Sequence, residues 1–211
     1  PRGDNLDIYV KMIDAETLLR LTTDSAEDVR PVWSPDGCHL VFLRKYTDRS
    51  VYYLIPVLGG AERKLAEVFP YHVPILGNSP YFSPDGKYLA ISDKHSAAEP
   101  LSLFLLSIET GEKRRLTTPP GGTEDYYPAF SPNGRWLAFV RSTSLTTNDL
   151  YLMSLPSGEL RQLTFDNVTI AGVAWTADSR EIVFSSRKDS SIFHLWRIGI
   201  SGGEPQRNQN V

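Results

Sequence analysis

The sequence predicts an all-β fold of the β-propeller type, and three observations support this prediction. A turn of the Ser-Pro-Asp-Gly kind occurs four times, each directly after an aromatic residue, and successive aromatic residues lie 45–49 positions apart. An apolar run follows each turn, and a strand with an aromatic residue and a glycine turn comes next. Such a period indicates one unit copied in tandem, and four antiparallel strands per unit are typical of a propeller blade. The copies are Trp33-Ser34-Pro35-Asp36-Gly37, 82–86, 130–134 and 175–179.

Each turn is expected to join two antiparallel strands as a β-hairpin. Proline presets φ at about −65° in the second position, aspartate suits the third, and glycine adopts the left-handed conformation that closes the hairpin. The last copy has Ser179 in place of glycine. A left-handed serine costs about 1 kcal/mol, so this turn is expected either to be strained or to differ from the others.

The strands of one repeat are expected to grade from buried to exposed. The run after each turn is apolar at neighbouring positions, so both of its faces must be buried between other sheets; the four runs are 40–42, 89–91, 137–139 and 182–184. The third strand carries one aromatic residue per repeat, namely Tyr53, Phe104, Tyr151 and Trp196. The fourth strand is shorter and more polar, with a Leu or Leu-Thr near its end: Leu65, Leu116-Thr117 and Leu163-Thr164.

We assign the whole chain, 1–211, to one propeller domain. Residues 7–22 match the third and fourth strands of a repeat and form an outer half-blade, with Tyr9 in the aromatic column and Leu21 in the leucine column. About four and a half blades make an arc or a fragment of a larger propeller, or a ring that closes irregularly. The open blade edges of an arc are also expected to allow self-association. The full blades are expected at 28–66, 78–118, 125–165 and 170–208.

The composition argues against several classes of function. A net charge of −3 gives no basic surface for nucleic acid. Because Cys38 is the only cysteine, neither a disulfide within the chain nor a cysteine-based metal site can form. No apolar run approaches the roughly 18 residues of a membrane span. We expect no metal site and no cofactor, since the four histidines occupy different phases of the repeat: His39, His72, His95 and His194.

The repeat resembles the TolB-like (WD40-like) propeller repeat of bacterial proteins. The consensus is Pro-x-Trp/Phe-Ser-Pro-Asp-Gly-x-x-Leu-Ala-Phe, then a Gly-Gly turn and Arg-x-Leu-Thr, and it is matched at 31–37, 80–86 and 128–134. This family includes a periplasmic Tol–Pal component, the propellers of prolyl-oligopeptidase and tricorn-type peptidases, and domains of bacterial kinases and winged-helix regulators. The resemblance implies the fold, and it favours a periplasmic or other extracytoplasmic location, with a cytoplasmic one left open.

One segment, 199–203, matches the G-x-S-x-G pattern of a serine nucleophile elbow. Such an elbow needs a strand-to-helix turn, followed in the chain by an acid and a histidine. Here the segment aligns with the glycine turns of the other repeats, and no histidine follows His194. We interpret Ser201 as part of a hairpin turn and expect no catalytic residue in the chain.

The best candidate surface is the start of each innermost strand, because these segments surround the mouth of a propeller channel. Asp28 and Asp125 lie five positions before the aromatic residue, and Arg30, Tyr126 and Thr169 lie near the same place in their repeats. Such a mouth could bind a peptide terminus, a cation or a small polar molecule. Alternatively, Asp28 and Asp125 have a structural role and accept backbone hydrogen bonds at the start of the blade.

The segment 69–77 is apolar and aromatic where the other repeats are polar. It is expected either to form an exposed contact patch or to cover an open blade edge. The sequence leaves both interpretations open.

These observations favour a non-catalytic module that binds or senses a protein or a peptide. One alternative is a propeller that gates substrate access to a peptidase domain of the prolyl-oligopeptidase or tricorn type, located outside this chain. Another is a ligand-binding sensor at the end of a membrane-spanning regulator. Flanking sequence would separate them, because an α/β-hydrolase pattern downstream indicates the peptidase and an upstream winged helix with an apolar span indicates the regulator.

Overall fold

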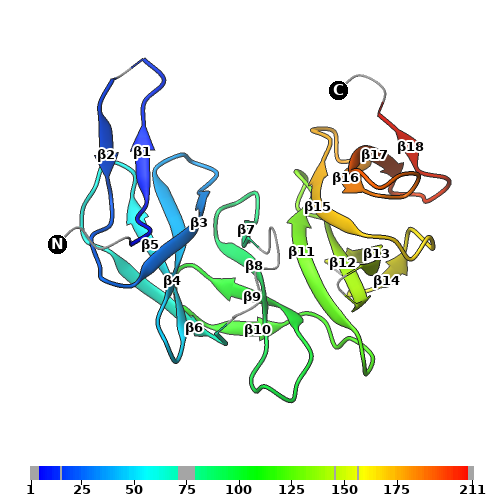
Figure 1. Ribbon diagram of the computed structural model, residues 1–211, viewed down its shortest axis with the longest axis horizontal. Coiled ribbons are helices and arrows are strands. Elements are labelled where there is room, and N and C mark those ends of the chain that lie inside the picture. The colour runs from blue at the N-terminus through cyan, green and yellow to red at the C-terminus, as the bar shows by residue number, and fades with distance from the viewer. Residues whose placement is uncertain (1–4, 15, 71–78, 145, 156, 209–211) are drawn as a thin grey trace.

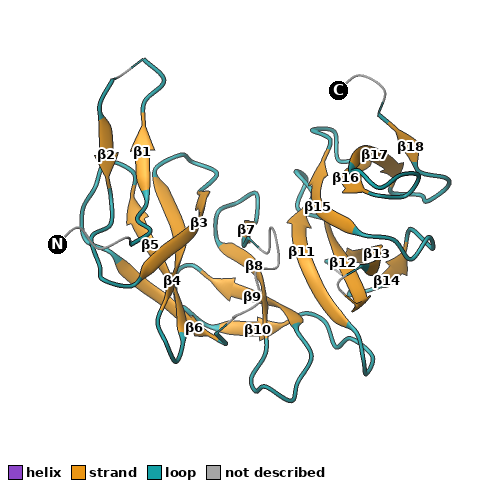
Figure 2. Cartoon of the chain, viewed as in Figure 1, coloured by secondary structure: helices purple, strands orange, loops and turns teal. Residues whose placement is uncertain are grey.

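All regular secondary structure that the computed structural model describes is β-strand (Figure 2). The structure describes residues 5–14, 16–70, 79–144, 146–155 and 157–208. This part of the chain contains 18 strands and no helix, hence no helical segment able to cross a membrane. Residues 71–77 of the apolar segment at 69–77 lie outside the described ranges. The predicted all-β fold of four-stranded antiparallel blades is confirmed.

The strands form four four-stranded antiparallel sheets and one two-stranded sheet, and in each four-stranded sheet the strands are ordered as in the chain. The two-stranded half-sheet consists of β1 (Tyr9–Lys11) and β2 (Leu18–Arg20). The first sheet contains β3 (Glu27–Trp33), β4 (His39–Lys45), β5 (Ser50–Pro56) and β6 (Arg63–Val68). The second contains β7 (Tyr81–Phe82), β8 (Tyr88–Asp93), β9 (Ser102–Ser107) and β10 (Lys113–Arg115). The third contains β11 (Glu124–Phe130), β12 (Trp136–Ser144), β13 (Thr147–Ser154) and β14 (Leu160–Gln162). The fourth contains β15 (Ile170–Trp175), β16 (Glu181–Ser186), β17 (His194–Gly199) and β18 (Gln206–Arg207).

The sheets follow one another around an arc, with β3, β7, β11 and β15 on its inner side (Figure 1). The half-sheet β1–β2 and the fourth sheet lie at the two ends of the arc, which stand apart. Tyr9 pairs with Arg20 in the half-sheet as Tyr53 pairs with Lys64 in the first sheet. By this register the half-sheet corresponds to the third and fourth strands of a blade.

Each Ser-Pro-Asp-Gly turn is held by the same hydrogen bonds. The Ser34 hydroxyl accepts the backbone N–H of His39 at 2.9 Å and donates to the Asp36 carboxylate at 2.5 Å, and that carboxylate accepts the N–H of Cys38 at 2.9 Å. The hydroxyl bond and the Cys38 N–H lower the pKa of Asp36 below its usual range. The three other turns repeat the pattern, with Asn133 or Thr176 as conservative replacements. The turns are hairpin connections, as predicted.

Ser179 keeps the left-handed geometry of the glycine that it replaces. Its φ is 61°, close to 70° at Gly37 and 68° at Gly134. The serine side chain makes a contact that glycine cannot make: its hydroxyl accepts a hydrogen bond from the backbone N–H of Asn133 at 3.1 Å, in the turn of the neighbouring sheet. The backbone strain at Ser179 is thus offset by a hydrogen bond between adjacent sheets.

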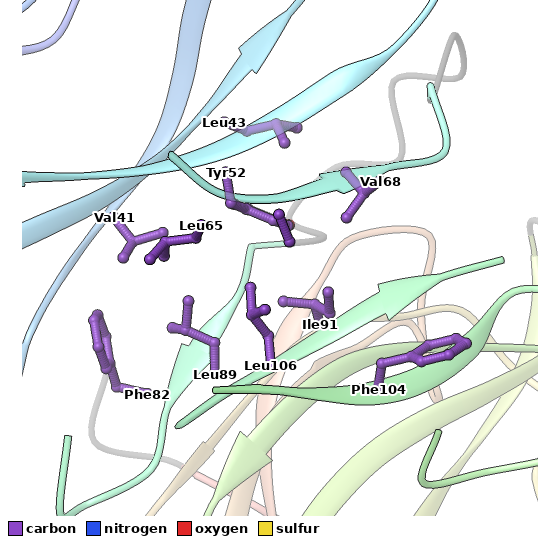
Figure 3. Close-up of a cluster of buried hydrophobic side chains, with 11 residues drawn as sticks. Val41, Leu43, Tyr52, Leu65, Val68, Phe82, Leu89, Ile91, Phe104 and Leu106 are labelled. Carbon is purple, nitrogen blue, oxygen red and sulfur yellow. The ribbon is translucent and has the colours of Figure 1, made fainter. Parts of the chain in front are cut away.

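The hydrophobic core lies between sheets rather than within them. Side chains of the first and second sheets point toward one another in one cluster, which includes Val41, Tyr52, Leu89, Ile91 and Leu106 (Figure 3). A comparable cluster lies between the half-sheet and the first sheet, one between the second and third, and one between the third and fourth. Strands such as β4 are buried on both faces because each face meets a different neighbouring sheet.

The Leu-Thr pair ends the outermost strand of a repeat with a side-chain hydrogen bond. The hydroxyls of Thr22, Thr117 and Thr164 each accept a backbone N–H of the adjacent strand at 2.9 Å. The hydroxyl takes the place of the next backbone acceptor in the ladder. In the first sheet, Ala66 occupies the threonine position, and β6 continues to Val68.

The hydrogen bond of Ser179 can be separated from its backbone strain by two substitutions. We expect Ser179→Ala to lose about 1 kcal/mol of unfolding free energy, because the bond to Asn133 is lost and the left-handed strain stays. Ser179→Gly loses the same bond but releases about 1 kcal/mol of strain, so its stability is expected to match that of the parent. Urea unfolding monitored by tryptophan fluorescence measures both values.

The matched control is Gly134→Ala, which places a side chain at the same left-handed position in the third sheet. It should cost about 1 kcal/mol. If Ser179→Ala is as stable as the parent chain, the hydrogen bond between the turns contributes nothing.

Candidate functional site

Two of the predicted site residues, Asp28 and Asp125, form buried ion pairs. Asp28 accepts two hydrogen bonds from Arg44, at 2.7 and 2.8 Å. Asp125 accepts two from Arg141, at 2.7 and 2.9 Å. Both carboxylate side chains are fully buried. Each aspartate therefore holds an arginine of the adjacent strand in a fixed orientation, which is a structural role, although its hydrogen-bond partner is a side chain rather than the backbone.

The two arginines lie over aromatic rings of their own sheets. Arg44 stands 4.8 Å from the ring centre of Tyr53, and Arg141 stands 4.9 Å from that of Tyr151. Arg44 also donates to Glu62 at 2.7 and 2.8 Å, so it connects the innermost and outer parts of the first sheet. Hydrogen bonds to Asp28 and Glu62 raise the pKa of Arg44 despite its desolvation. The guanidinium is permanently charged, and the carboxylates of Asp28 and Glu62 neutralise its charge.

The second and fourth sheets replace this ion pair. In the second sheet, Asp93 occupies the position of the arginine and pairs with Lys113 at 2.6 Å, so the sign of the charge is reversed. In the fourth sheet, Ile170 lies opposite Ser186, and the pair is uncharged. The strand-start end of the sheets, where the innermost strands begin, thus differs from repeat to repeat.

Arg30 lies in a β-bulge that recurs in the innermost strands. Arg30 and Tyr127 have φ values of 57° and 51°, and Gly172 has 106° at the same place in the fourth sheet. The strand pairing shifts by one residue at each of these positions. Burial raises the pKa of Tyr127, while the positive charge of Arg30 opposes that rise. In two of these bulges, a non-glycine residue has the left-handed conformation, which costs backbone strain energy. The feature recurs on the inner side of the arc.

Tyr126 lines a pocket of mixed polar and apolar character between the second and third sheets, which we call the strand-start pocket. Its volume is about 540 Å³, within the range of ligand sites in proteins. The loop 94–100 forms one wall, residues 121–124 and Tyr126 form another, and 142–144 close the third side. Asp125, next to Tyr126, is buried. The ion pair of Asp125 with Arg141 therefore anchors the strand that carries the wall of the pocket.

The strand-start pocket combines small residues with charged groups. The rim of the pocket is open because the residues there are small and exposed, namely Ala97, Ala98, Gly121 and Gly122. Among the charged groups, the Lys94 ammonium lies 4.8 Å from the ring centre of Phe69. Glu99 accepts a hydrogen bond from Arg115 at 2.5 Å, which lowers the pKa of Glu99. Glu124 accepts one from the Tyr126 hydroxyl. The pocket offers both signs of charge and backbone at its edge, which suits a peptide segment.

Two other cavities lie at the turn end of the sheets. One of about 620 Å³ is bounded by the turns of the first and second sheets. The other, of about 340 Å³, has aromatic and proline walls contributed by three sheets, including Trp33, Tyr81 and Pro132. Their walls are mostly the hairpin turns themselves and the aromatic residues before them.

The predicted site residues do not form one cluster. The Thr169 hydroxyl donates to the backbone carbonyl of Thr146 at 3.2 Å, in the loop before the fourth sheet. Arg30 and Asp28 belong to the first sheet, and Asp125 and Tyr126 to the third. Among the described residues, no group of three metal-ligating side chains gathers. Of the five predicted site residues, Tyr126 is the one that lines the strand-start pocket.

Residues 199–203 form the turn between β17 and β18, as interpreted from the sequence. The N–H of Gly202 donates to the carbonyl of Gly199 at 2.9 Å, and Gly202 and Gly203 have φ values of 87° and 114°. His194 begins β17, so about 16 Å of strand separates it from this turn. The geometry is that of a hairpin, without the helix that a nucleophile elbow requires.

Sequence reasoning missed Arg44 and Arg141, although a signal for them exists. Each arginine follows its aspartate by 16 residues. Counting outward from the turn without a bulge places Asp28 opposite Lys45, whereas the observed partner is Arg44. The recurring separation of 16 residues between aspartate and arginine predicts the pair, whereas the strand register counted from the turn does not. Glu99 and Tyr127 carry no comparable signal, because neither residue type recurs at its position in another repeat. A cation does recur at the position of Lys94, as Lys45 and Arg187.

Comparisons with known proteins identify the repeat and several longer proteins that contain it. A family model for the TolB beta propeller domain matches residues 71–209. "Uncharacterized peptidase YuxL" of Bacillus subtilis is 30 % identical over a region that covers 56 % of this chain and 22 % of that protein. A structure of a putative TolB from Agrobacterium tumefaciens superimposes with a TM-score of 0.73 at 24 % identity, covering 92 % of this chain and 66 % of the other.

A puromycin hydrolase also has this fold. Its structure superimposes with a TM-score of 0.70 at 16 % identity, covering 92 % of this chain and 31 % of the hydrolase. At such identities the structural likeness concerns the fold alone. The chain spans about a fifth of the Bacillus relative and a third of the hydrolase.

The ion pair beneath the strand-start pocket can be tested by a double-mutant cycle. We expect Asp125→Ala to lose about 3–5 kcal/mol of unfolding free energy, because Arg141 is left buried without its partner. The double variant Asp125→Ile with Arg141→Met replaces the pair by apolar side chains, as the fourth sheet does in part with Ile170. It should recover most of the loss, and denaturant unfolding measures each value.

The single variant Arg141→Met, which leaves Asp125 unpaired, completes the cycle. If the double variant loses as much as the two single variants together, the pair has no coupling, and the anchoring role assigned to Asp125 is wrong.

Proposed function

Because the chain belongs to the TolB β-propeller domain family, we propose that it is a non-catalytic module that binds a protein or peptide partner. We further propose that the strand-start pocket is the binding site. The observation that carries this proposal is a pocket of about 540 Å³ at the strand-start end, with both polar and apolar walls and an open rim of small residues. Small residues at the rim allow a partner backbone to approach closely.

The chemistry of the pocket favours a peptide over a small apolar ligand. Lys94 supplies a cation and Glu124 supplies a carboxylate. Ser142 and Thr143 lie on the third wall, and their hydroxyls donate to backbone carbonyls of the same segment. A peptide carries amide groups and side chains of both charges, which complement such a set. In this proposal Tyr126 contacts the ligand, and Asp125 acts as a positioning residue through the ion pair with Arg141.

The other predicted residues have weaker roles in the proposal. Asp28 positions Arg44 in the first sheet as Asp125 positions Arg141 in the third. Arg30 and Thr169 lie near the starts of other innermost strands, where a long partner would extend beyond the pocket. We propose no contact with nucleic acid or with a membrane for this domain. The open edges of the arc are proposed to allow self-association.

The location follows from the resemblance to TolB rather than from a feature of the site. We propose a periplasmic or other extracytoplasmic location, with the cytoplasm as the alternative. Cys38 is exposed and the described residues contain no other cysteine, which is compatible with either compartment.

A second candidate function is favoured by the Bacillus relative, which is named a peptidase, and by the puromycin hydrolase. In that case the propeller gates substrate access to a catalytic domain outside residues 1–211. The strand-start pocket would then select substrates rather than hold a regulatory partner. An α/β-hydrolase pattern in flanking sequence would favour this function.

Blocking the strand-start pocket tests the binding proposal. A random peptide library displayed on phage is selected against the parent chain after depletion on Ala98→Trp, whose indole fills the pocket from an exposed rim position. We expect enriched peptides to bind Ala98→Trp at least about tenfold more weakly than the parent, as measured by calorimetry.

The matched control is Ala61→Trp, which adds the same indole at an exposed position between β5 and β6. The selected peptides should bind this variant within about twofold of the parent. Selection that yields no peptide preferring the parent over Ala98→Trp would show that the pocket is not a peptide site.

The absence of catalysis is tested on Ser201. We expect the chain to release no product from a p-nitrophenyl ester or a peptide anilide above the buffer rate, because Ser201 lies in a hairpin turn. Hydrolysis that Ser201→Ala abolishes would overturn this expectation and assign the chain its own active site.

A further inference from the structure

The two cavities at the turn end of the sheets share walls, and we call their combined surface the turn-end groove. Pro35, Phe82 and Pro84 line both the cavity of about 340 Å³ and the cavity of about 620 Å³. The smaller part is bounded by the ends of the innermost strands β3, β7 and β11, and the larger part reaches Leu54 of β5 and Arg63 of β6. Both volumes are in the range of ligand sites in proteins.

The turn-end groove lies around the second sheet, which has a neighbouring sheet on each side. Its walls come from the second sheet and from the turns of the first and third sheets. These sheets stack directly on one another through two of the core clusters. Additional strands would join at the ends of the arc, which are formed by the half-sheet and the fourth sheet (Figure 1).

The smaller part of the groove has the chemistry of a site for an extended, proline-rich segment. Tyr81 is 39 % exposed there, and it stands among the exposed turn prolines Pro84 and Pro132. A polyproline II segment has no internal hydrogen bonds, and proteins recognise it with grooves lined by aromatic residues. Rigid ring side chains also lose little conformational entropy when a ligand binds.

The larger part of the groove adds the carboxylates of Asp36 and Asp85. In each carboxylate, Oδ1 accepts the hydroxyl of the turn serine and one backbone N–H, at distances from 2.5 to 3.1 Å. The hydroxyl bond, assisted by the N–H bond, lowers the pKa of both carboxyls below the usual range. Both groups are therefore ionised at neutral pH. None of the hydrogen bonds described for them reaches Oδ2, so this atom is left for a ligand.

Two carboxylates distinguish this junction of turns from the two that follow. The corresponding residues are Asp85 and Asn133 between the second and third sheets, and Asn133 and Asp178 between the third and fourth. The permanently charged cation on the wall is Arg63, which donates to the carbonyl of Ile108 at 2.8 Å. Two carboxylates and one guanidinium leave the larger part with a net negative charge, which attracts a cation.

We propose that the turn-end groove binds an extended segment of a partner protein that combines prolines with one arginine or lysine. The prolines lie against Tyr81 and the turn prolines, and the cation reaches Asp36 and Asp85. An arginine is favoured over a lysine, because its planar fork can donate to two carboxylate oxygens at once. The groove is at the opposite end of the sheets from the strand-start pocket, and this inference does not rest on peptide binding there.

Fluorescence polarisation with a panel of labelled peptides tests the proposal. The peptides consist of proline and leucine, with a single arginine placed at each position in turn. At least one member is expected to bind the parent chain. The same peptide with citrulline in place of arginine should bind at least about tenfold more weakly. Citrulline keeps the shape of arginine without its charge, so this comparison needs no altered protein.

A pair of substitutions removes the charge of the groove and keeps its turns. Asp36→Asn with Asp85→Asn is tolerated by the turn geometry, because Asn133 accepts the same two bonds in the third sheet, at 2.8 and 3.0 Å. The double variant should bind the arginine peptide at least about tenfold more weakly than the parent. The matched control Asp178→Asn makes the same change in the fourth sheet, and it should bind within about twofold of the parent.

Two further variants locate the peptide. Tyr81→Ala shortens the aromatic wall and should weaken binding about tenfold. Ala98→Trp, which fills the strand-start pocket, should leave binding within about twofold of the parent. Thermal unfolding establishes that each variant is folded.

Three results would overturn the proposal. The first is a panel in which no peptide binds the parent chain, and the second is a citrulline peptide that binds as tightly as its arginine counterpart. The third is a peptide whose binding is lost in Ala98→Trp and kept in the folded double asparagine variant, because that peptide occupies the strand-start pocket.

Discussion

Burial of both faces of the second strand of each repeat is the constraint on which the rest of this structure depends. Strands such as β4 and β12 are apolar on both faces, and the sheet to which a strand belongs covers neither of these faces. Only a sheet before and a sheet behind can do so, which fixes the tandem stacking. The turns, the hydrogen bonds between neighbouring turns and the short outer strands serve this stacking.

The fold was predictable because its signals are local and repeated. The turn, the apolar run and the aromatic column recur with a fixed spacing, and the half-sheet was found by matching Tyr9 and Leu21 to that spacing. The site was predictable only in part. A β-bulge at Arg30 shifts the pairing by one residue, so the partner of Asp28 cannot be read from the distance to the turn. Tyr126 was found by its phase, but the loop 94–100 that faces it differs in length and sequence from the corresponding connection at 46–49. The repeat pattern therefore does not predict its position.

The two ends of the sheets differ in how closely their side-chain contacts repeat from sheet to sheet. At the turn end, a hydroxyl donates to the side-chain oxygen two residues later in all four sheets, a carboxylate in three of them and the Asn133 amide in the third sheet, because this bond sets the hairpin geometry. At the strand-start end, an Asp–Arg pair, a reversed Asp–Lys pair and an uncharged Ile–Ser pair occupy related positions. Variation among repeats that share one backbone indicates that side chains there serve individual purposes. The strand-start pocket lies at the variable end, between two sheets with different charge arrangements.

The threonine that ends an outermost strand has a consequence for solubility. An outer strand is an edge whose free backbone groups can template pairing with another polypeptide, and a longer edge is the greater aggregation hazard. Strands β2, β10 and β14, each ended by a threonine hydroxyl, have three residues, whereas β6, with Ala66 at that position, has six. In these three sheets, the hydroxyl thus ends the exposed edge after three paired residues. Among the described outer strands, β6 of the first sheet is therefore the longest exposed edge.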